Sequence, residues 1–295
     1  MAKLTKFILL ILLIWFIWFF NIKPFQINSQ INIASYLAEE GHCQAAVETM
    51  ENILPKTSFL DSYSRLKYVE IINNCMAKEN LEKTKPLLEK TIKALEEAVK
   101  TRPYYTRSWF LLGQYNNLLL ENWQEDRGEQ ARTALEKALE LSPRRQEVLQ
   151  ELARTYIITG EYEEAGEKAE QCINLNEKLA SCWWLEGLAN IYLNDIEKAD
   201  YNMQIAAEKR YPVKSEDSYL QLAKAYIEIK NYPRLVGVYL KLIKLEPENP
   251  KNYASLAFVY RELNQIEEAR KQALKIIELF PEHRTETEEF LRTLE

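Results

Sequence analysis

Four cysteines and two histidines are the residues of this chain whose chemistry goes beyond ordinary packing. They are Cys43, Cys75, Cys172, Cys182, His42 and His283. No C-x2-C pair occurs and the two histidines lie far apart, so a zinc site or a Ser-His-Asp triad would lack its side chains. Disulfide formation is the chemistry that these residues fit, with four buried apolar thiols as the alternative.

His42 stands directly beside Cys43, and such a pair could supply a nucleophile and its base. No Asn or Asp lies at a recognisable spacing to orient the imidazole, so the simpler interpretation is an exposed histidine in a turn. The phosphate-binding motifs G-x-x-x-x-G-K-[ST] and G-x-G-x-x-G are also absent. We therefore expect no catalytic residues, no metal, no cofactor and no enzymatic activity.

The composition favours helices and argues against a nucleic-acid partner. The chain has 295 residues, 47% of them hydrophobic and 28% charged, with only seven glycines and ten prolines. Strand-rich proteins need more turn residues than this. The net charge is −6, and Lys3, Lys6 and Lys23 lie in or beside an apolar segment, so the remainder is more acidic still. A chain this acidic lacks the basic surface that binds phosphate backbones.

An apolar segment near the N-terminus has the length and composition of a membrane anchor or a signal peptide. Residues 7–20 form an unbroken apolar run, and residues 4–22 would make a helix about 28 Å long, against about 30 Å of bilayer hydrocarbon. The residues that follow offer no small-x-small cleavage site, and Trp15 and Trp18 cluster toward one end as an interfacial belt would. The sequence predicts an uncleaved anchor over 1–24, while a cleaved signal peptide and a buried helix remain alternatives.

The flanking charges predict an orientation for this anchor. The N-terminal amine, Lys3 and Lys6 precede the apolar run, and only Lys23 follows it closely. The positive-inside bias then places the N-terminus in the cytoplasm. We expect a single-pass protein of the cell membrane, in contact with lipid through residues 7–22, with everything after Pro24 extracytoplasmic.

The rest of the chain repeats itself with a period of 34 residues. Tyr219, Leu222, Ala223 and Tyr226 recur as Tyr253, Leu256, Ala257 and Tyr260. Within each unit apolar residues fall at i, i+3, i+4 and i+7, which is one face of a helix. Pro247 and Pro281 follow the second helix of their units and stop it. Similar units lie at 149–177 and 103–143, and less regular ones lie at 180–212, 58–103 and 28–55.

These residues resemble the tetratricopeptide-repeat family, whose pattern is W-x2-L-G-x2-Y, then A-x3-F-x2-A, then P. The resemblance covers about residues 28–281. It implies an all-α, right-handed superhelical solenoid of about seven antiparallel helix hairpins over 25–282, with 283–295 as a polar capping helix. It also implies a scaffold that binds a protein partner, of unknown identity, along the concave groove of its first helices.

The repeat register assigns candidate residues to that groove. They are Arg107, Phe110, Gln114, Arg154, Lys224, Phe258 and Arg261. One of them, Arg107, belongs to an aromatic and basic cluster with Arg102, Tyr104, Tyr105 and Trp109. That cluster is either a stacking platform for a sugar or peptide, or a repeat junction whose Trp109 fills the core.

The same register places the cysteines in two pairs. Cys43 falls early in the second helix of the first unit, and Cys75 falls late in the first helix of the next. Cys172 falls late in a second helix, and Cys182 falls early in the helix that follows. Neighbouring helices run antiparallel, so early and late positions face each other and Cα separations near 5.5–6 Å are expected. We predict at least one disulfide among these pairs.

A second resemblance concerns the first half of the chain. The N-x-K-P junction, the string G-H-C-Q-A-A and the string RPYYTRSWFLLGQY are similar to the extracytoplasmic repeat tails of bacterial O-antigen ligase-like membrane proteins. The resemblance carries no catalytic signature. It implies, as an alternative function, an accessory protein of cell-envelope glycan assembly that contacts a saccharide or a polytopic glycan enzyme.

Overall fold

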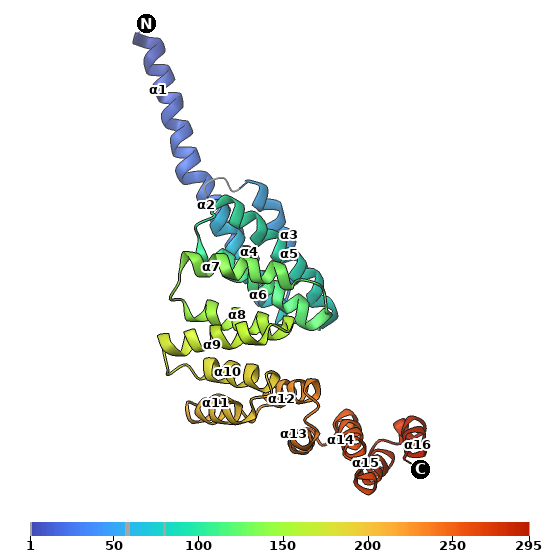
Figure 1. The fold of residues 1–295 in the computed structure, drawn as a ribbon. Coiled ribbons are helices and arrows are strands. Elements are labelled where there is room, and N and C mark those ends of the chain that lie inside the picture. Colours follow the sequence, from blue (N-terminus) through green and yellow to red (C-terminus); the bar gives the residue numbers. More distant parts are fainter. Residues whose placement is uncertain (1, 57–59, 79–80, 295) are drawn as a thin grey trace. The chain divides into compact units, whose positions relative to one another are not determined.

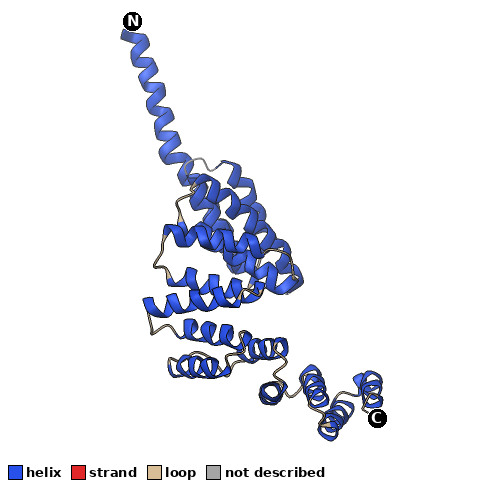
Figure 2. Cartoon of the chain, viewed as in Figure 1, coloured by secondary structure: helices blue, strands red, loops and turns tan. Residues whose placement is uncertain are grey.

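The computed structural model describes residues 2–56, 60–78 and 81–294. Within these ranges every regular element is a helix, as Figure 2 shows. The α-helices, labelled in Figure 1, are α1 (Ala2–Ile17), α2 (Lys23–Glu39), α3 (Cys43–Ile53), α4 (Asp61–Met76), α5 (Leu81–Thr101), α6 (Thr106–Trp123), α7 (Gly128–Leu141), α8 (Gln146–Thr159), α9 (Tyr162–Leu175), α10 (Ala180–Tyr192), α11 (Ile196–Glu208), α12 (Glu216–Glu228), α13 (Tyr232–Leu245), α14 (Pro250–Glu262), α15 (Ile266–Leu279) and α16 (Arg284–Arg292). The expected all-α class is confirmed.

From α2 onward the helices follow one another as hairpins. Seven pairs, from α2–α3 to α14–α15, precede the short helix α16 in the described part of the chain. The chain divides into two compact units, residues 1–151 (unit 1) and 152–295 (unit 2).

The helix ends follow from local sequence. The side chains of Asn231 and Asn249 accept hydrogen bonds from backbone N–H groups in the first turns of α13 and α14. An N-cap of this kind satisfies a donor that the helix leaves unpaired. Pro250 occupies the first turn of α14, where its missing N–H costs nothing. Asn194 and Asn264 adopt positive φ angles of 60° and 57° just beyond α10 and α14, ending those helices.

Small residues set how closely paired helices approach. A Cβ added at Gly113 in α6 would overlap the Leu135 side chain and lie 3.0 Å from the Ala131 carbonyl oxygen. Leu135 and Ala131 are fully buried in α7. The space that a side chain at Gly113 would need is therefore already filled, and the glycine permits the contact between α6 and α7.

The N-terminal apolar segment continues into the first hairpin without a break. A π-helical turn, Trp18–Ile22, joins α1 to α2, and the Lys23 N–H bonds to the Trp18 carbonyl. Leu4–Glu39 is the one helix, among the described residues, that is long and apolar enough to cross a membrane, and its apolar part is wholly unburied. The predicted anchor boundary at residue 24 thus falls inside a continuous helix.

Both cysteine pairs are joined as disulfides. Cys43 at the start of α3 bonds to Cys75 near the end of α4, with a Cα–Cα distance of 5.5 Å. Cys172 near the end of α9 bonds to Cys182 near the start of α10, with a Cα–Cα distance of 6.0 Å. Each bond links two successive hairpins within one unit, in the pairing that the antiparallel register predicts.

Helix α16 follows α15 after a short 3₁₀ turn, Pro281–His283. It buries Thr287, and Leu294 is buried just beyond its end. Its other face carries charged side chains. A terminal helix of this kind closes the last apolar surface of a repeat array, as the sequence predicts for 283–295.

Candidate functional site

The predicted groove residues lie on the first helices of their hairpins. In unit 1, α6 carries Arg107, Phe110 and Gln114. In unit 2, α8, α12 and α14 carry Arg154, Lys224, Phe258 and Arg261. Arg107, Lys224 and Phe258 are exposed, and the other four are partly buried.

The unit 1 surface is already engaged in contacts of its own. The Arg145 guanidinium lies 5.5 Å from the centroid of the Phe110 ring. Gln114 Nε2 and Asn117 Nδ2 donate to the two carboxylate oxygens of Glu151, at 3.5 and 3.2 Å. These hydrogen bonds hold polar side chains of α6 against Glu151 of α8. Arg107 in the first turn of α6 remains exposed.

The aromatic and basic cluster divides between core and surface. Trp109 is partly buried against an apolar cluster of unit 1, and its indole N–H donates to the Pro103 carbonyl at 2.8 Å. Tyr104, by contrast, is 83% exposed. Trp109 therefore contributes to packing, whereas Tyr104, Arg102 and Arg107 are exposed to solvent.

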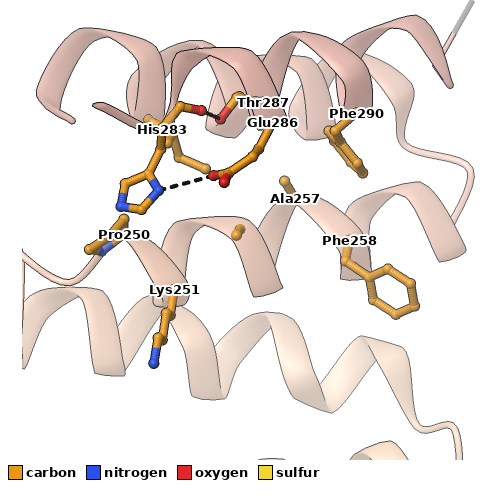
Figure 3. A pocket seen from close by; sticks show the side chains of 10 residues that line it. Pro250, Lys251, Ala257, Phe258, His283, Glu286, Thr287 and Phe290 are labelled. Atoms are coloured by element: carbon orange, nitrogen blue, oxygen red, sulfur yellow. Dashed lines mark hydrogen bonds and ion pairs between the residues drawn. The ribbon is translucent and has the colours of Figure 1, made fainter. Parts of the chain in front are cut away.

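In unit 2 a groove residue borders a pocket between α14 and α16. The pocket has a volume of about 250 Å³. Its walls, shown in Figure 3, come from Pro250, Lys251, Ala254, Ala257, Phe258, Ile276, His283, Glu286, Thr287 and Phe290. Ala254 and Ala257 leave the space open because their side chains are short. The floor is apolar, and the charged groups stand at the rim.

The two ends of this pocket differ chemically. At one end His283 Nδ1 lies 3.2 Å from a Glu286 carboxylate oxygen (Figure 3). At the other end the Arg261 guanidinium lies 4.8 Å from the Phe258 ring centroid and 5.6 Å from that of Phe290. Stacking of this kind holds a guanidinium beside apolar surface. The pocket thus combines an apolar interior with the Arg261 guanidinium at one edge, which also forms an ion pair with Glu262 at 3.0 Å.

At α10 the equivalent groove position is filled by the protein itself. Trp184 is only 2% exposed, because Tyr211 stacks on it with a centroid distance of 4.8 Å and an interplanar angle of 16°. The Trp184 indole N–H also donates to Gln221 Oε1 at 2.7 Å. Tyr211 comes from the connection between α11 and α12, residues 209–215, which is longer than the connections 176–179 and 246–249. Sequence reasoning missed this covered position, and the longer connection was the available signal.

The structure offers no reactive centre at the His42–Cys43 pair. His42 is exposed at the N-cap of α3, and the Cys43 sulfur is bonded to Cys75. In the described part of the chain no group of three or more His, Cys, Asp or Glu side chains is placed to hold a metal ion. The Cys43–Cys75 disulfide therefore links two helices and leaves no free thiol beside His42 for nucleophilic attack.

Two family models match this hairpin array. Both are described as tetratricopeptide repeat, and they cover residues 122–167 and 238–271. This chain is a tetratricopeptide-repeat protein. The matched segments include parts of the hairpins α6–α7, α8–α9 and α12–α13 and most of α14–α15.

Curated relatives are similar to part of the array. Anaphase-promoting complex subunit 3 of Schizosaccharomyces pombe is 24% identical over 204 residues, which are 68% of this chain and 28% of that protein. The BBSome complex member BBS4 of Bos taurus is 24% identical over 129 residues, which are 44% of this chain and 24% of that protein. The chain spans about a quarter of the length of these relatives, so the matches concern the repeats alone.

Solved structures show the same fold. A tetratricopeptide-repeat protein from Parabacteroides merdae superposes with a TM-score of 0.64 at 13% identity, over 91% of this chain and 98% of that one. The anaphase-promoting complex hetero-tetramer Cut9–Hcn1 gives a TM-score of 0.56 at 15% identity, over 88% and 48%. The resemblance to O-antigen ligase-like tails gains no support from these proteins and stays a prediction.

Proposed function

We propose that this tetratricopeptide-repeat protein is a membrane-anchored, non-enzymatic scaffold that binds a segment of a protein partner at unit 2. The pocket between α14 and α16 is the observation that carries the proposal. Phe258, which the repeat register assigns to the groove, forms part of its wall. Arrays of this family present such first-helix surfaces to other proteins.

The pocket suits one large apolar side chain of the partner. Its volume of about 250 Å³ and its apolar floor favour Leu, Ile, Met or Phe. Burying such a side chain contributes about 1.5–3 kcal/mol. A carboxylate beside that anchor would share the Arg261 guanidinium with Glu262, which already pairs with it, while Phe258 and Phe290 hold the guanidinium in place. We therefore expect an apolar anchor residue flanked by Asp or Glu.

The N-terminal helix would hold this scaffold at a membrane. Its apolar side chains are exposed along α1, which is unfavourable in water over so long a segment. The positive-inside bias favours an extracytoplasmic array, and disulfides form and persist in oxidising compartments outside the cytosol. Two relatives are by name members of multi-subunit complexes, which supports a role in assembly.

A pocket-filling variant tests the partner site. Ala254→Leu adds bulk to the pocket wall, whereas Ala207→Leu adds the same bulk at an exposed position on α11. The three full-length proteins are used to capture partners from detergent-solubilised membranes of the native host. We expect proteins that wild type and Ala207→Leu retain and that Ala254→Leu loses. If all three retain the same proteins, the pocket is not the binding site.

A saccharide contact is the second candidate, and the exposure of Tyr104 favours it. Its ring is 83% exposed, close in sequence to Arg102 and Arg107, and an exposed ring with basic neighbours can stack on a sugar. Binding of envelope glycan fragments that falls in Tyr104→Ala but not in Tyr201→Ala would support an accessory role in glycan assembly. Tyr201 is also exposed, at 60%, and lies on α11.

A further inference from the structure

A second pocket lies where the apolar helix meets the first hairpin. Its volume is about 640 Å³. The residues around it are Trp18, Lys23, Gln26, Ile27, Gln30, Thr49, Asn52 and Ile53. It lies between the start of α2 and the end of α3, which are adjacent because the two helices run antiparallel.

The end of this pocket nearest the apolar run lies within the depth of a headgroup layer. At 1.5 Å per residue, Gln26 lies about 6 Å and Gln30 about 12 Å beyond Ile22 along the helix. The polar layer on each side of a bilayer is about 5–8 Å deep. With residues 4–22 in the hydrocarbon, the Lys23 and Gln26 end of the pocket therefore lies at the level of the lipid headgroups, and the Gln30 end extends a few ångströms beyond it.

The chemistry of the pocket is that of neutral hydrogen bonding with one positive charge. Gln26, Gln30 and Asn52 are exposed carboxamides, and each offers two donors and one carbonyl acceptor. A hydroxyl group both donates and accepts, so it can satisfy both halves of a carboxamide. None of the eight residues around the pocket is acidic. The pocket thus favours a ligand with several hydroxyls and tolerates a negative charge.

The single cation stands at the membrane end of the pocket. Lys23 Nζ lies 5.9 Å from the Trp18 ring centroid and 5.7 Å from that of Phe19. Among the described residues no carboxylate forms an ion pair with Lys23. The ammonium group is thus held near the ring faces, at the depth where a lipid phosphate lies.

We propose that this pocket binds the headgroup of a membrane lipid in which a phosphodiester is followed by vicinal hydroxyls, as in phosphatidylglycerol. The phosphate pairs with Lys23, and the hydroxyls bond to the carboxamides of Gln26, Gln30 and Asn52. The inference rests on the proposed membrane anchoring, because only an inserted helix brings the pocket to the headgroup layer.

Native mass spectrometry of the full-length protein in detergent tests this site. The probes are phosphatidylglycerol, phosphatidylserine and phosphatidylcholine with identical acyl chains. Phosphatidylserine has the same net charge as phosphatidylglycerol but lacks the diol. We expect phosphatidylglycerol to bind at least five-fold more tightly than phosphatidylserine, with phosphatidylcholine weakest. Equal affinity for the two anionic lipids overturns the proposal.

A triple variant, Gln26→Ala with Gln30→Ala and Asn52→Ala, should abolish this preference. The matched control removes three exposed helix amides elsewhere, through Gln44→Ala, Gln130→Ala and Gln204→Ala. Far-UV circular dichroism checks that both variants keep their helix content. The proposal is wrong if the triple variant keeps the preference, or if the control loses it.

Two further measurements distinguish the lipid-headgroup site from a site for a free polyol phosphate and from membrane anchoring alone. Soluble sn-glycerol 1-phosphate should not displace the bound lipid, and displacement would show a site for a free polyol phosphate. Extraction of native membranes with alkaline carbonate tests the anchoring by itself. Release of the protein refutes the anchor, whereas retention without any phosphatidylglycerol preference refutes the headgroup site and leaves the anchor standing.

Discussion

Substituting Gly113 with alanine tests how closely the two helices of one hairpin pack. The new Cβ would overlap Leu135, which is fully buried, and would lie 3.0 Å from the Ala131 carbonyl oxygen. The carbonyl belongs to the backbone of α7 and cannot rotate away. Relief therefore requires α6 and α7 to move apart.

Two opposing effects set the size of the change. Replacing glycine by alanine inside a helix stabilises by about 0.5–1 kcal/mol. Forcing an extra methyl into a packed contact costs about 1–3 kcal/mol. We expect the cost of overpacking to exceed the gain in helix propensity. Gly113→Ala should therefore lower the free energy of unfolding of unit 1 by about 1–2 kcal/mol.

Two other glycines calibrate the result. A Cβ at Gly237 in α13 would meet nothing within 4 Å, so Gly237→Ala should stabilise by about 0.5–1 kcal/mol. A Cβ at Gly187 would lie 2.9 Å from Met203 Cγ, in a flexible side chain, so Gly187→Ala should be nearly neutral.

Urea denaturation of each full-length variant, followed by far-UV circular dichroism, measures the order of the three glycine variants. Hydrogen exchange then assigns each change to its unit. If Gly113→Ala stabilises as much as Gly237→Ala, the helices are not packed as closely as described, and the reasoning fails.

Three further predictions concern the disulfides, the buried tyrosines and the covered groove position. Reduction of the Cys43–Cys75 bond should destabilise unit 1 by about 3 kcal/mol, and thiol labelling of intact cells should reach these residues only after a reductant. Burial raises the pKa of Tyr226. The folded state therefore holds the Tyr226 proton more tightly than the unfolded state does. The stability that this contributes is fully present below about pH 10 and is lost as the pH rises further. Tyrosinate absorbance recorded during alkaline unfolding measures this loss. Tyr211→Ala should expose Trp184 and shift its emission to the red, a shift that must vanish when Trp184→Phe is the background.

Periodic features of the chain were predictable from its sequence. Leu235, Tyr239 and Leu242 repeat at helical spacing and are buried together in α13. The spacing of Cys172 and Cys182 around one inter-hairpin connection was enough to place them 6.0 Å apart at Cα. Such patterns are readable because each repeat contacts only its neighbours in sequence.

Features that depend on tertiary placement were not predictable. Tyr211 lies in an irregular connection, where no periodicity shows that it covers Trp184. Ala254 reads as an ordinary helix residue, and only the position of α16 turns its small side chain into the wall of a pocket. Gln30 and Asn52 read as solvated polar positions, because nothing in the sequence shows that they border the same space.

Given the membrane anchoring proposed above, the unbroken helix from Leu4 to Glu39 fixes the direction in which the first hairpin faces. A flexible linker would let the first hairpin reorient freely above a bilayer, whereas a continuous helix couples the rotation of its two ends. Each residue advances a helix by about 100°. One residue inserted near Ile22 would therefore turn the first hairpin by more than a quarter of a revolution about the helix axis. Seven inserted residues make nearly two full turns and would restore the original direction while lifting the hairpin about 10 Å. In the anchored arrangement that we propose, helical phase more than length thus decides which side of the first hairpin meets other molecules in the plane of the membrane.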